Sequence, residues 1–142
     1  MESNKDIRWI QRYDNYHRAC GRLLEVTEGE KSLADLSELE KEGLVQRFEY
    51  TLELAWKVLQ DLMIYKGYDF MTGPNGTIKM AFEDGIISDH DGWRRMMNAR
   101  SLMTHTYDEE DAAMVTEFIW TDFSALLKQL DSTLGSLAEK EG

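Results

Sequence analysis

Cysteine, proline and long apolar runs are scarce in this sequence. It has one cysteine and one proline among 142 residues, and no apolar run approaches the roughly 20 residues that span a membrane. The single Cys20 excludes an internal disulfide and a zinc site of the CxxC kind, so we expect a small core residue there. The first residues, MESNKDIRWIQRYDNYH, are too polar for a secretory signal, which predicts a cytoplasmic protein without membrane association.

Positive charge is also in short supply. Sixteen Lys and Arg residues stand against 27 Asp and Glu residues, which gives a net charge of −11. Such a protein repels a polyanion at long range, and this argues against a general nucleic-acid binder. Any phosphate-bearing ligand must be held locally. Residues 92–107 offer a place, because they contain Arg94, Arg95 and Arg100 and no acidic residue, although these arginines would equally pair with acidic neighbouring helices.

Apolar residues recur at steps of three and four along most of the chain, which predicts α-helices. Trp9 and Tyr16 belong to the first such stripe, and Leu44 and Leu62 to the second. No stretch shows the alternation of a β-strand. The sequence therefore predicts one all-α domain over residues 1–142, an antiparallel up-and-down four-helix bundle with an extra short helix. The predicted helices cover about 5–26, 36–65, 77–83 and 92–103, followed by a last helix that begins after Thr106 and fades near 137.

One glycine-rich stretch, KGYDFMTGPNG, predicts the main loop. It holds the only proline, and Pro74, Asn75 and Gly76 are all turn formers. The stretch lacks the GxxxxGK[ST] and GxGxxG patterns of phosphate-binding loops. We therefore interpret it as a turn between helices and assign it no ligand.

Two polar clusters predict the starts of helices. The triplet Asp89-His90-Asp91 suggests either metal ligands or helix N-caps. We favour caps, because three consecutive side chains converge on one ion only in an unusual turn, and no fourth ligand is indicated. Thr106 with Glu109 three residues later predicts a capping box at the start of the last helix.

The segment ARSLMTHTYDEE, residues 99–110, places Arg100, His105 and Tyr107 within eight residues. Arginine offers a fixed fork of donors that suits phosphate, and histidine titrates near neutrality and moves protons. Together they suit cleavage of RNA, in which the histidine takes a proton from a 2′-hydroxyl and the arginine neutralises the phosphorane. The phenol of Tyr107 offers a nucleophile or an acceptor for group transfer. The alternative is a structural role for all three side chains in the bundle.

Helix geometry limits how Arg100 and His105 act together. In an unbroken helix, side chains five positions apart point roughly 140° away from each other. One small ligand reaches both only if the helix loosens near Thr104, if the long arginine wraps around the helix, or if a second subunit supplies half of the site.

Other polar side chains are candidates for lining a groove that meets the ligand or a partner. On the second helix, Glu49 and Glu53 are one turn apart and lie near aromatic residues in the sequence. The alternative for each candidate is an ordinary solvated helix face. The candidates are Arg47, Glu49, Glu53, Trp56, Arg94 and Arg95.

Three separated blocks carry a family resemblance. The segments KEGLVQRFEYTLELAWKVLQDLM, IKMAFEDGIISDHDGW and ARSLMTHTYDEEDA resemble the substrate-binding subunit family of small nucleotidyltransferases, a branch of the HEPN domains. The similarity covers about residues 8–137 in the same order. It implies an all-α bundle that forms a homodimer and works with a minimal nucleotidyltransferase called MNT. The chain has no Gly-Ser-x-aspartate signature of nucleotidyltransferases, so we do not expect it to transfer nucleotides itself.

The resemblance also gives the Arg100 segment a meaning. Arg100, His105 and Tyr107 match the R-x4-H-x-Y signature of HEPN toxins. In that family the arginine and histidine are associated with ribonuclease activity, and the tyrosine receives AMP from the MNT partner. Ser101 stands where asparagine is often found, and it keeps a polar side chain as support beside the arginine.

Two functions follow from these observations. The first, which the acidic charge favours, is a non-catalytic subunit that binds a nucleotide or RNA and pairs with MNT in a system similar to toxin-antitoxin pairs. The second is a metal-independent ribonuclease toxin that uses Arg100 and His105 and is neutralised by AMP transfer to Tyr107. A purely structural scaffold is a weaker third interpretation. None of the three calls for a cofactor or a bound metal ion.

Overall fold

The computed structural model describes residues 8–69, 73–105 and 108–141. These residues form helices and turns and contain no β-strand, so the predicted all-α class is confirmed. The helices are α1 (Arg8–Thr27), α2 (Glu38–Tyr65), α3 (Gly73–Asp84), α4 (His90–His105), α5 (Glu109–Phe118) and α6 (Ser124–Glu141), with a 3-10 turn at Leu33–Asp35 and a π-helical turn at Ile119–Phe123.

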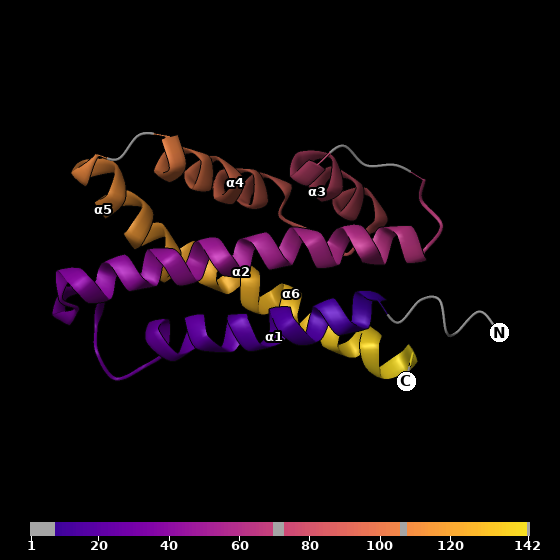
Figure 1. Ribbon diagram of the computed structural model, residues 1–142, viewed down its shortest axis with the longest axis horizontal. Helices are drawn as coiled ribbons and strands as arrows, with labels where there is room; N and C mark the ends of the chain where they lie inside the picture. The colour runs from indigo at the N-terminus through magenta and orange to yellow at the C-terminus, as the bar shows by residue number, and fades with distance from the viewer. Residues whose placement is uncertain (1–7, 70–72, 106–107, 142) are drawn as a thin grey trace.

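The long helix α2 organises the bundle. Figure 1 shows α1 running antiparallel beside it, while α3 and α4 follow one another along its other side. Helix α6 packs mainly against α1, and α5 contacts both α2 and α4. A capping box begins α2, because Ser37 Oγ accepts from the Glu40 N–H and the Glu40 carboxylate accepts from the Ser37 N–H. Among the described helices, none is both long and apolar enough to cross a membrane.

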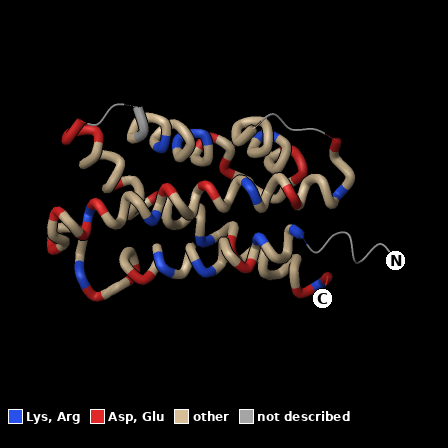
Figure 2. The backbone as a smooth tube through the Cα atoms, viewed as in Figure 1, with Lys and Arg blue, Asp and Glu red and all other residues tan. Residues whose placement is uncertain are grey.

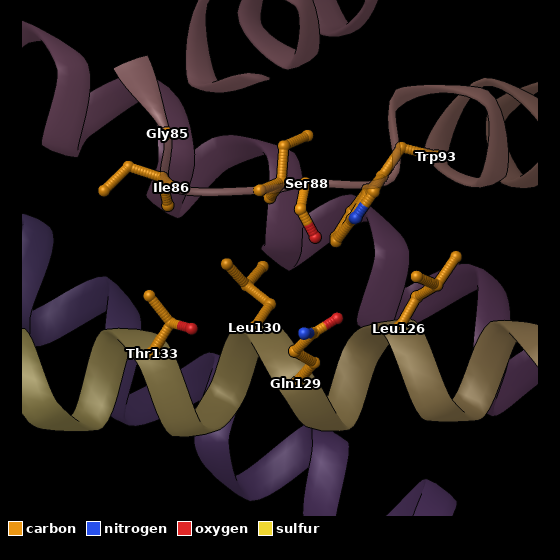
Figure 3. Close-up of a pocket in the computed structure, with 9 residues that line it drawn as sticks. Gly85, Ile86, Ser88, Trp93, Leu126, Gln129, Leu130 and Thr133 are labelled. Atoms are coloured by element: carbon orange, nitrogen blue, oxygen red, sulfur yellow. The ribbon is translucent and has the colours of Figure 1, made fainter. Parts of the chain in front are cut away.

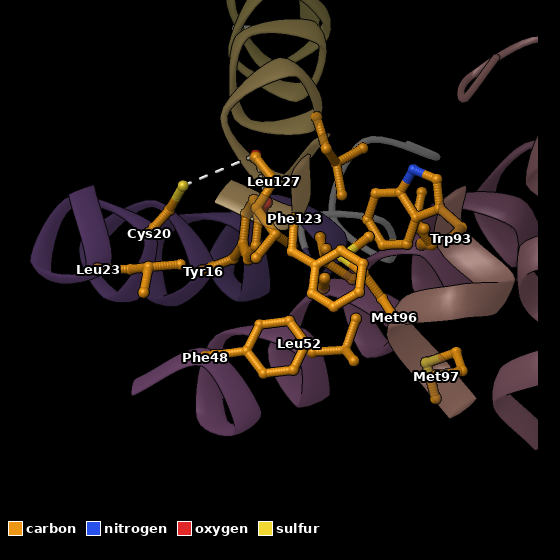
Figure 4. Close-up of a cluster of buried hydrophobic side chains, with 14 of the residues drawn as sticks. Tyr16, Cys20, Leu23, Phe48, Leu52, Trp93, Met96, Met97, Phe123 and Leu127 are labelled. Atoms are coloured by element: carbon orange, nitrogen blue, oxygen red, sulfur yellow. Dashed lines mark hydrogen bonds between the residues drawn. The ribbon is translucent and has the colours of Figure 1, made fainter. Parts of the chain in front are cut away.

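The hydrophobic core lies where α1, α2, α4 and α6 face one another (Figure 4). The rings of Phe48 on α2 and Phe123 are stacked with their centroids 5.4 Å apart. Cys20 is fully buried, as predicted, and its sulfur lies 3.7 Å from the carbonyl oxygen of Leu127. Burial raises the pKa of this thiol to about 12, so it stays protonated and serves as a core residue.

The predicted main loop is shorter than expected. Pro74, Asn75 and Gly76 lie in the first turn of α3, which begins at Gly73 rather than near 77. Gly73 has a positive φ of 64°, which suits the bend into the helix. A proline is favourable just inside a helix start, because its missing N–H has no intrahelical acceptor there. The same residue types therefore fit a turn or a helix start.

The expected caps are found in part. Asp89 caps α4, since its Oδ1 accepts from the Gly92 N–H at 2.9 Å, and the His90 ring stacks on Phe82. Within the described residues, no group of three His, Cys, Asp or Glu side chains is placed to hold a metal ion. Helix α5 begins at Glu109 with Asp108 as its N-cap, which is later than the capping box from Thr106 to Glu109 predicts, and Thr106 itself lies outside the described residues.

The predicted last helix is interrupted by a π-helical turn. The N–H of Ser124 reaches back five residues to the carbonyl of Ile119, one residue further than in an α-helix. This wider turn brings the rings of Phe118 and Phe123 into a stack with centroids 5.6 Å apart. Periodicity alone does not reveal the change, because the apolar stripe continues through both helices.

Candidate functional site

Arg100 lies at the end of the buried stripe of α4. Trp93, Met96 and Met97 are buried against the core, and Arg100 follows at the same helical spacing. Its long side chain starts beside the core and reaches α2, where Nη2 lies 2.5 Å from Glu53 Oε1. About a third of the side chain stays exposed, at 35%.

Carboxylates of α2 surround this arginine. Burial raises the pKa of Glu49, and the positive charge of Arg100 opposes that rise. Burial also acts to raise the pKa of Glu53, but donors on Trp56 and Lys57 and the charge of Arg100 outweigh it and lower the pKa. Glu53 is therefore ionised at neutral pH and orients the guanidinium. Of the predicted groove residues, Glu53 pairs with Arg100, Glu49 interacts with its charge, and Trp56 lies beside Glu53.

The remaining groove candidates lie elsewhere. Arg47 Nη1 donates to the carbonyl oxygen of Arg22 at 2.7 Å, so this side chain ties α2 to α1. Arg94 and Arg95 are exposed on α4, away from the stripe that carries Arg100. The local excess of arginine seen in the sequence is therefore divided between different faces of the bundle.

The rest of the Arg100 motif is placed only in part. Ser101 is exposed on α4, next to Arg100. His105 is the last residue of α4, and its side chain and the whole of Tyr107 lie outside the described residues. The backbone of α4 stays helical through His105, so it does not loosen near Thr104. A shared ligand then requires the arginine to wrap around α4 or a second subunit to supply half of the site.

A broad groove lies beside this segment, between the start of α2 and α5, with a volume of about 1660 Å³. We call it the acidic groove, because six of the seven charged residues in its described lining are glutamates. Met103, one turn beyond Arg100, and Glu49 belong to its lining, so the groove adjoins the arginine. Its lining consists of Leu33, Ala34, Glu38, Lys41, Glu42, Val45, Gln46, Glu49, Met103, Glu109, Glu110, Ala112, Ala113, Met114, Thr116 and Glu117.

A second, smaller pocket of about 190 Å³ lies between the α3–α4 connection and α6 (Figure 3). It is lined by apolar side chains together with the neutral polar groups of Ser88, Gln129 and Thr133. None of the described residues that line it is charged, so these residues offer no counter-charge for phosphate. It is separated from the Arg100 segment, because its α4 residue, Trp93, is two turns away from Arg100.

Sequence reasoning missed the acidic groove as a whole. Periodicity assigns Met114 to the core stripe of the last helix, yet 45% of its surface is exposed, and it lines the groove. The signal available was the dense glutamate content at the starts of two helices, which first suggests helix-dipole stabilisation. His17, which carried no predicted role, makes a contact of 2.9 Å with Asp131 between α1 and α6.

Comparison with known proteins gives concordant matches. The family model for "Nucleotidyltransferase substrate binding protein like" matches residues 11–136. A Haemophilus influenzae protein named "Probable ribonuclease HepT" is 31% identical over 96 residues, which cover 62% of this chain and 65% of that protein. The chain thus matches slightly less than two thirds of this relative. A crystal structure from Thermus thermophilus shares 33% identity with a TM-score of 0.73, over 86% of this chain and 98% of that one.

Proposed function

This chain belongs to the nucleotidyltransferase substrate-binding protein family, and within it we propose that the protein is a ribonuclease controlled by a nucleotidyltransferase partner. The observation that carries the proposal is Arg100, partly exposed at the end of α4 and oriented by Glu53, as the first residue of an intact R-x4-H-x-Y motif. The name of the 31% identical relative, a probable ribonuclease, supports the same activity.

The proposed reaction needs no group beyond the chain and RNA. His105 takes the proton of a 2′-hydroxyl, and the 2′-oxygen attacks the adjacent phosphorus. Arg100 neutralises the charge that builds on the phosphoryl oxygens. The bond from phosphorus to the 5′-oxygen then breaks, and the leaving oxygen takes up a proton. The products are a 2′,3′-cyclic phosphate and a free 5′-hydroxyl.

Glu53 positions the arginine for this step. A guanidinium has five N–H donors in a fixed plane, so it can hold more than one acceptor, and Glu53 is one of them. The carboxylate also reduces the net positive charge at the site. We therefore expect binding of RNA to be weak and local, as the net charge of −11 requires.

Tyr107 is the proposed point of control. Its phenolic oxygen attacks the α-phosphorus of ATP bound to the nucleotidyltransferase partner, pyrophosphate leaves, and the tyrosine proton is released. The AMP that is attached adds negative charge two residues from His105. It would compete with RNA for Arg100 and block the site, so a modified chain is inactive.

A non-catalytic role is the second candidate. The description of the family as substrate-binding and the acidic surroundings of Arg100 favour it. In this role the protein binds a nucleotide or RNA at Arg100 and presents it to the partner enzyme without cutting it.

Cleavage of RNA by purified protein separates the two candidates. Intact mass first confirms that Tyr107 is unmodified, and a labelled RNA pool is then incubated with wild type, Arg100→Ala and His105→Ala. Arg94→Ala is the matched control, because it removes an exposed arginine from the same helix. We expect cyclic-phosphate ends from wild type and Arg94→Ala, and a loss of about 100-fold or more in the other two variants.

RNA with a single 2′-hydroxyl gives the sharper readout. Cleavage must occur only 3′ of that ribose, because the attacking oxygen belongs to it. If unmodified wild type binds RNA and leaves it intact, while Arg100→Ala loses binding, the substrate-binding role replaces the ribonuclease. If wild type and His105→Ala cut equally, the cutting is contamination.

A further inference from the structure

The acidic groove is too large for an ordinary small-molecule site. Its volume of about 1660 Å³ exceeds the roughly 300–1,000 Å³ that small ligands occupy. One wall comes from the start of α2 and the other from α5, and Met103 of α4 also belongs to its lining. This volume and these two helical walls suit a segment of protein chain.

The charges of the groove select the kind of occupant. Among the described residues that line it, Lys41 is the one positively charged side chain, against six glutamates. Figure 2 shows acidic residues at the first turns of α2 and α5, which lie at the same end of the molecule. Such a surface repels nucleic acid and attracts a cationic segment. The groove therefore has the opposite preference from the neighbouring Arg100.

Apolar side chains lie between these charges. Met103, Met114 and Val45 line the groove, and Met114 is 45% exposed. Methionine is unbranched and adapts its shape to different partners. An apolar surface bordered by one sign of charge is the pattern on which amphipathic helices of opposite charge dock. Charge and apolar surface together point to one class of partner.

We propose that the acidic groove binds a basic amphipathic helix of another protein. The apolar side of that helix packs on Met103 and Met114, and its Lys and Arg side chains reach Glu42 on α2 and Glu117 on α5. Because Met103 is one turn from Arg100, the bound helix lies beside the proposed RNA site. The proposal does not depend on ribonuclease activity, since it rests on the groove alone.

A synthetic helix tests this directly. The probe is a fluorescein-labelled peptide of about 18 residues, with leucines along one face and lysines and alanines elsewhere, long enough to be helical when bound. Its control is a peptide of the same composition in scrambled order. Fluorescence anisotropy measures binding to wild type, Glu42→Gln/Glu117→Gln, Met114→Ala and Glu25→Gln/Glu139→Gln. The last variant loses the same charge from sites on α1 and α6, outside the groove.

The expected result is a preference for the amphipathic peptide over the scrambled one. Affinity falls at least about fivefold in the Glu42/Glu117 pair and in Met114→Ala, and changes less than about twofold in the Glu25/Glu139 pair. Circular dichroism confirms that each variant is folded.

Three results would overturn the proposal. If both glutamate pairs lose the same affinity for the peptide, the peptide is attracted by the overall charge of the protein and does not bind at the groove. Equal binding of both peptides means that the apolar surface plays no part. If the amphipathic peptide does not bind wild type, the groove does not take a basic helix; if the Glu42/Glu117 pair also changes the mass measured by sedimentation, the groove holds a second copy of this chain.

Discussion

Polar side chains of α1 make hydrogen bonds to α6 at several points along the contact between the two helices. The hydroxyl of Tyr16, fully buried, donates to the carbonyl oxygen of Leu127 at 2.6 Å. Burial raises the pKa of Tyr16 well above its usual value, so the phenol remains a donor at all ordinary pH values. Tyr13, one turn earlier and partly exposed, makes a longer contact of 3.4 Å to the carbonyl of Asp131.

We expect Tyr16→Phe to destabilise the protein by about 1 kcal/mol, because it removes a buried hydrogen bond while keeping the ring. Tyr13→Phe is the control, and its longer, partly exposed contact predicts a change below about 0.5 kcal/mol. Urea unfolding monitored by circular dichroism measures both. Equal losses of stability in the two variants would show that burial of the tyrosine hydroxyl does not determine how much its hydrogen bond stabilises the protein.

Asp84 gives a pH-dependent prediction at the same scale. Burial acts to raise its pKa, but contacts with Lys66 at 2.6 Å and the Tyr68 hydroxyl at 2.5 Å outweigh this and lower the pKa. Because the pKa of Asp84 is lower in the folded than in the unfolded protein, the ionised carboxylate stabilises the folded state at pH values above the unfolded pKa of about 4. This stabilisation is lost as the pH falls through the pKa of the folded state.

Wild type should therefore exceed Asp84→Asn in stability by about 1 kcal/mol at pH 7, and the gap should shrink below about pH 4. Urea midpoints of both proteins at about pH 7 and about pH 3 provide the test. Asp122→Asn, which removes an exposed carboxylate, serves as the control and should show little gap at either pH. A gap that is constant or that widens in acid contradicts the assignment.

At the scale of elements, helix ends decide where the site lies. The capping box of Ser37 and Glu40 fixes where α2 begins. The same helix carries Glu49 and Glu53, and Glu53 pairs with Arg100. The Glu40 carboxylate accepts hydrogen bonds from the Lys31 ammonium and from the Ser37 N–H. These two bonds hold the turn before α2 against the start of the helix.

Ser37→Ala should cost about 1 kcal/mol, because the N–H of Glu40 loses its acceptor. Ser136→Ala is the matched control on the exposed side of α6, where alanine is at least as favourable as serine in a helix. Thermal or urea unfolding of both variants measures the difference. If both substitutions are neutral, water satisfies the start of α2 and the cap is dispensable.

The sequence predicts the helices that have a long apolar stripe, but it does not predict how these helices begin, end and connect. The periodicity of α1 and α2 predicted both helices to within a few residues, because burial of one face dominates their stability. Pro74 and Gly76 were misjudged, since the same residues favour turns and helix starts. The π-helical turn at Ile119–Phe123 leaves no mark in the stripe, because the apolar residues on each side still reach the core.

The candidate site was predictable as a motif but not as a set of contacts. Arg100 stood out by its chemistry and spacing, yet its pairing with Glu53 depends on how α4 crosses α2. No local pattern encodes that crossing. The acidic groove was hidden for the same reason, because its two walls come from distant parts of the sequence and only packing brings them together.

At the scale of the whole molecule, the charge of −11 and the geometry of α4 both bear on assembly. Helix α4 continues without a break through His105, so the side chains at positions 100 and 105 leave the helix in directions roughly 140° apart. A single chain therefore does not readily bring both side chains to one phosphate. A symmetric pair of copies resolves this if each site takes Arg100 from one chain and His105 from the other. We therefore expect the proposed ribonuclease activity to require the predicted homodimer.

A mixed dimer distinguishes a shared site from two separate ones. Arg100→Ala and His105→Ala chains, carrying different tags, are co-expressed and purified through both tags. In a shared site, the mixed dimer has one site with both substitutions and one intact site, so we expect about half of wild-type RNA cleavage although each parent is inactive. A dimer of wild type with His105→Ala provides the half-activity reference. If the mixed dimer is as inactive as its parents, Arg100 and His105 act within one chain, and Arg100 must then reach around α4.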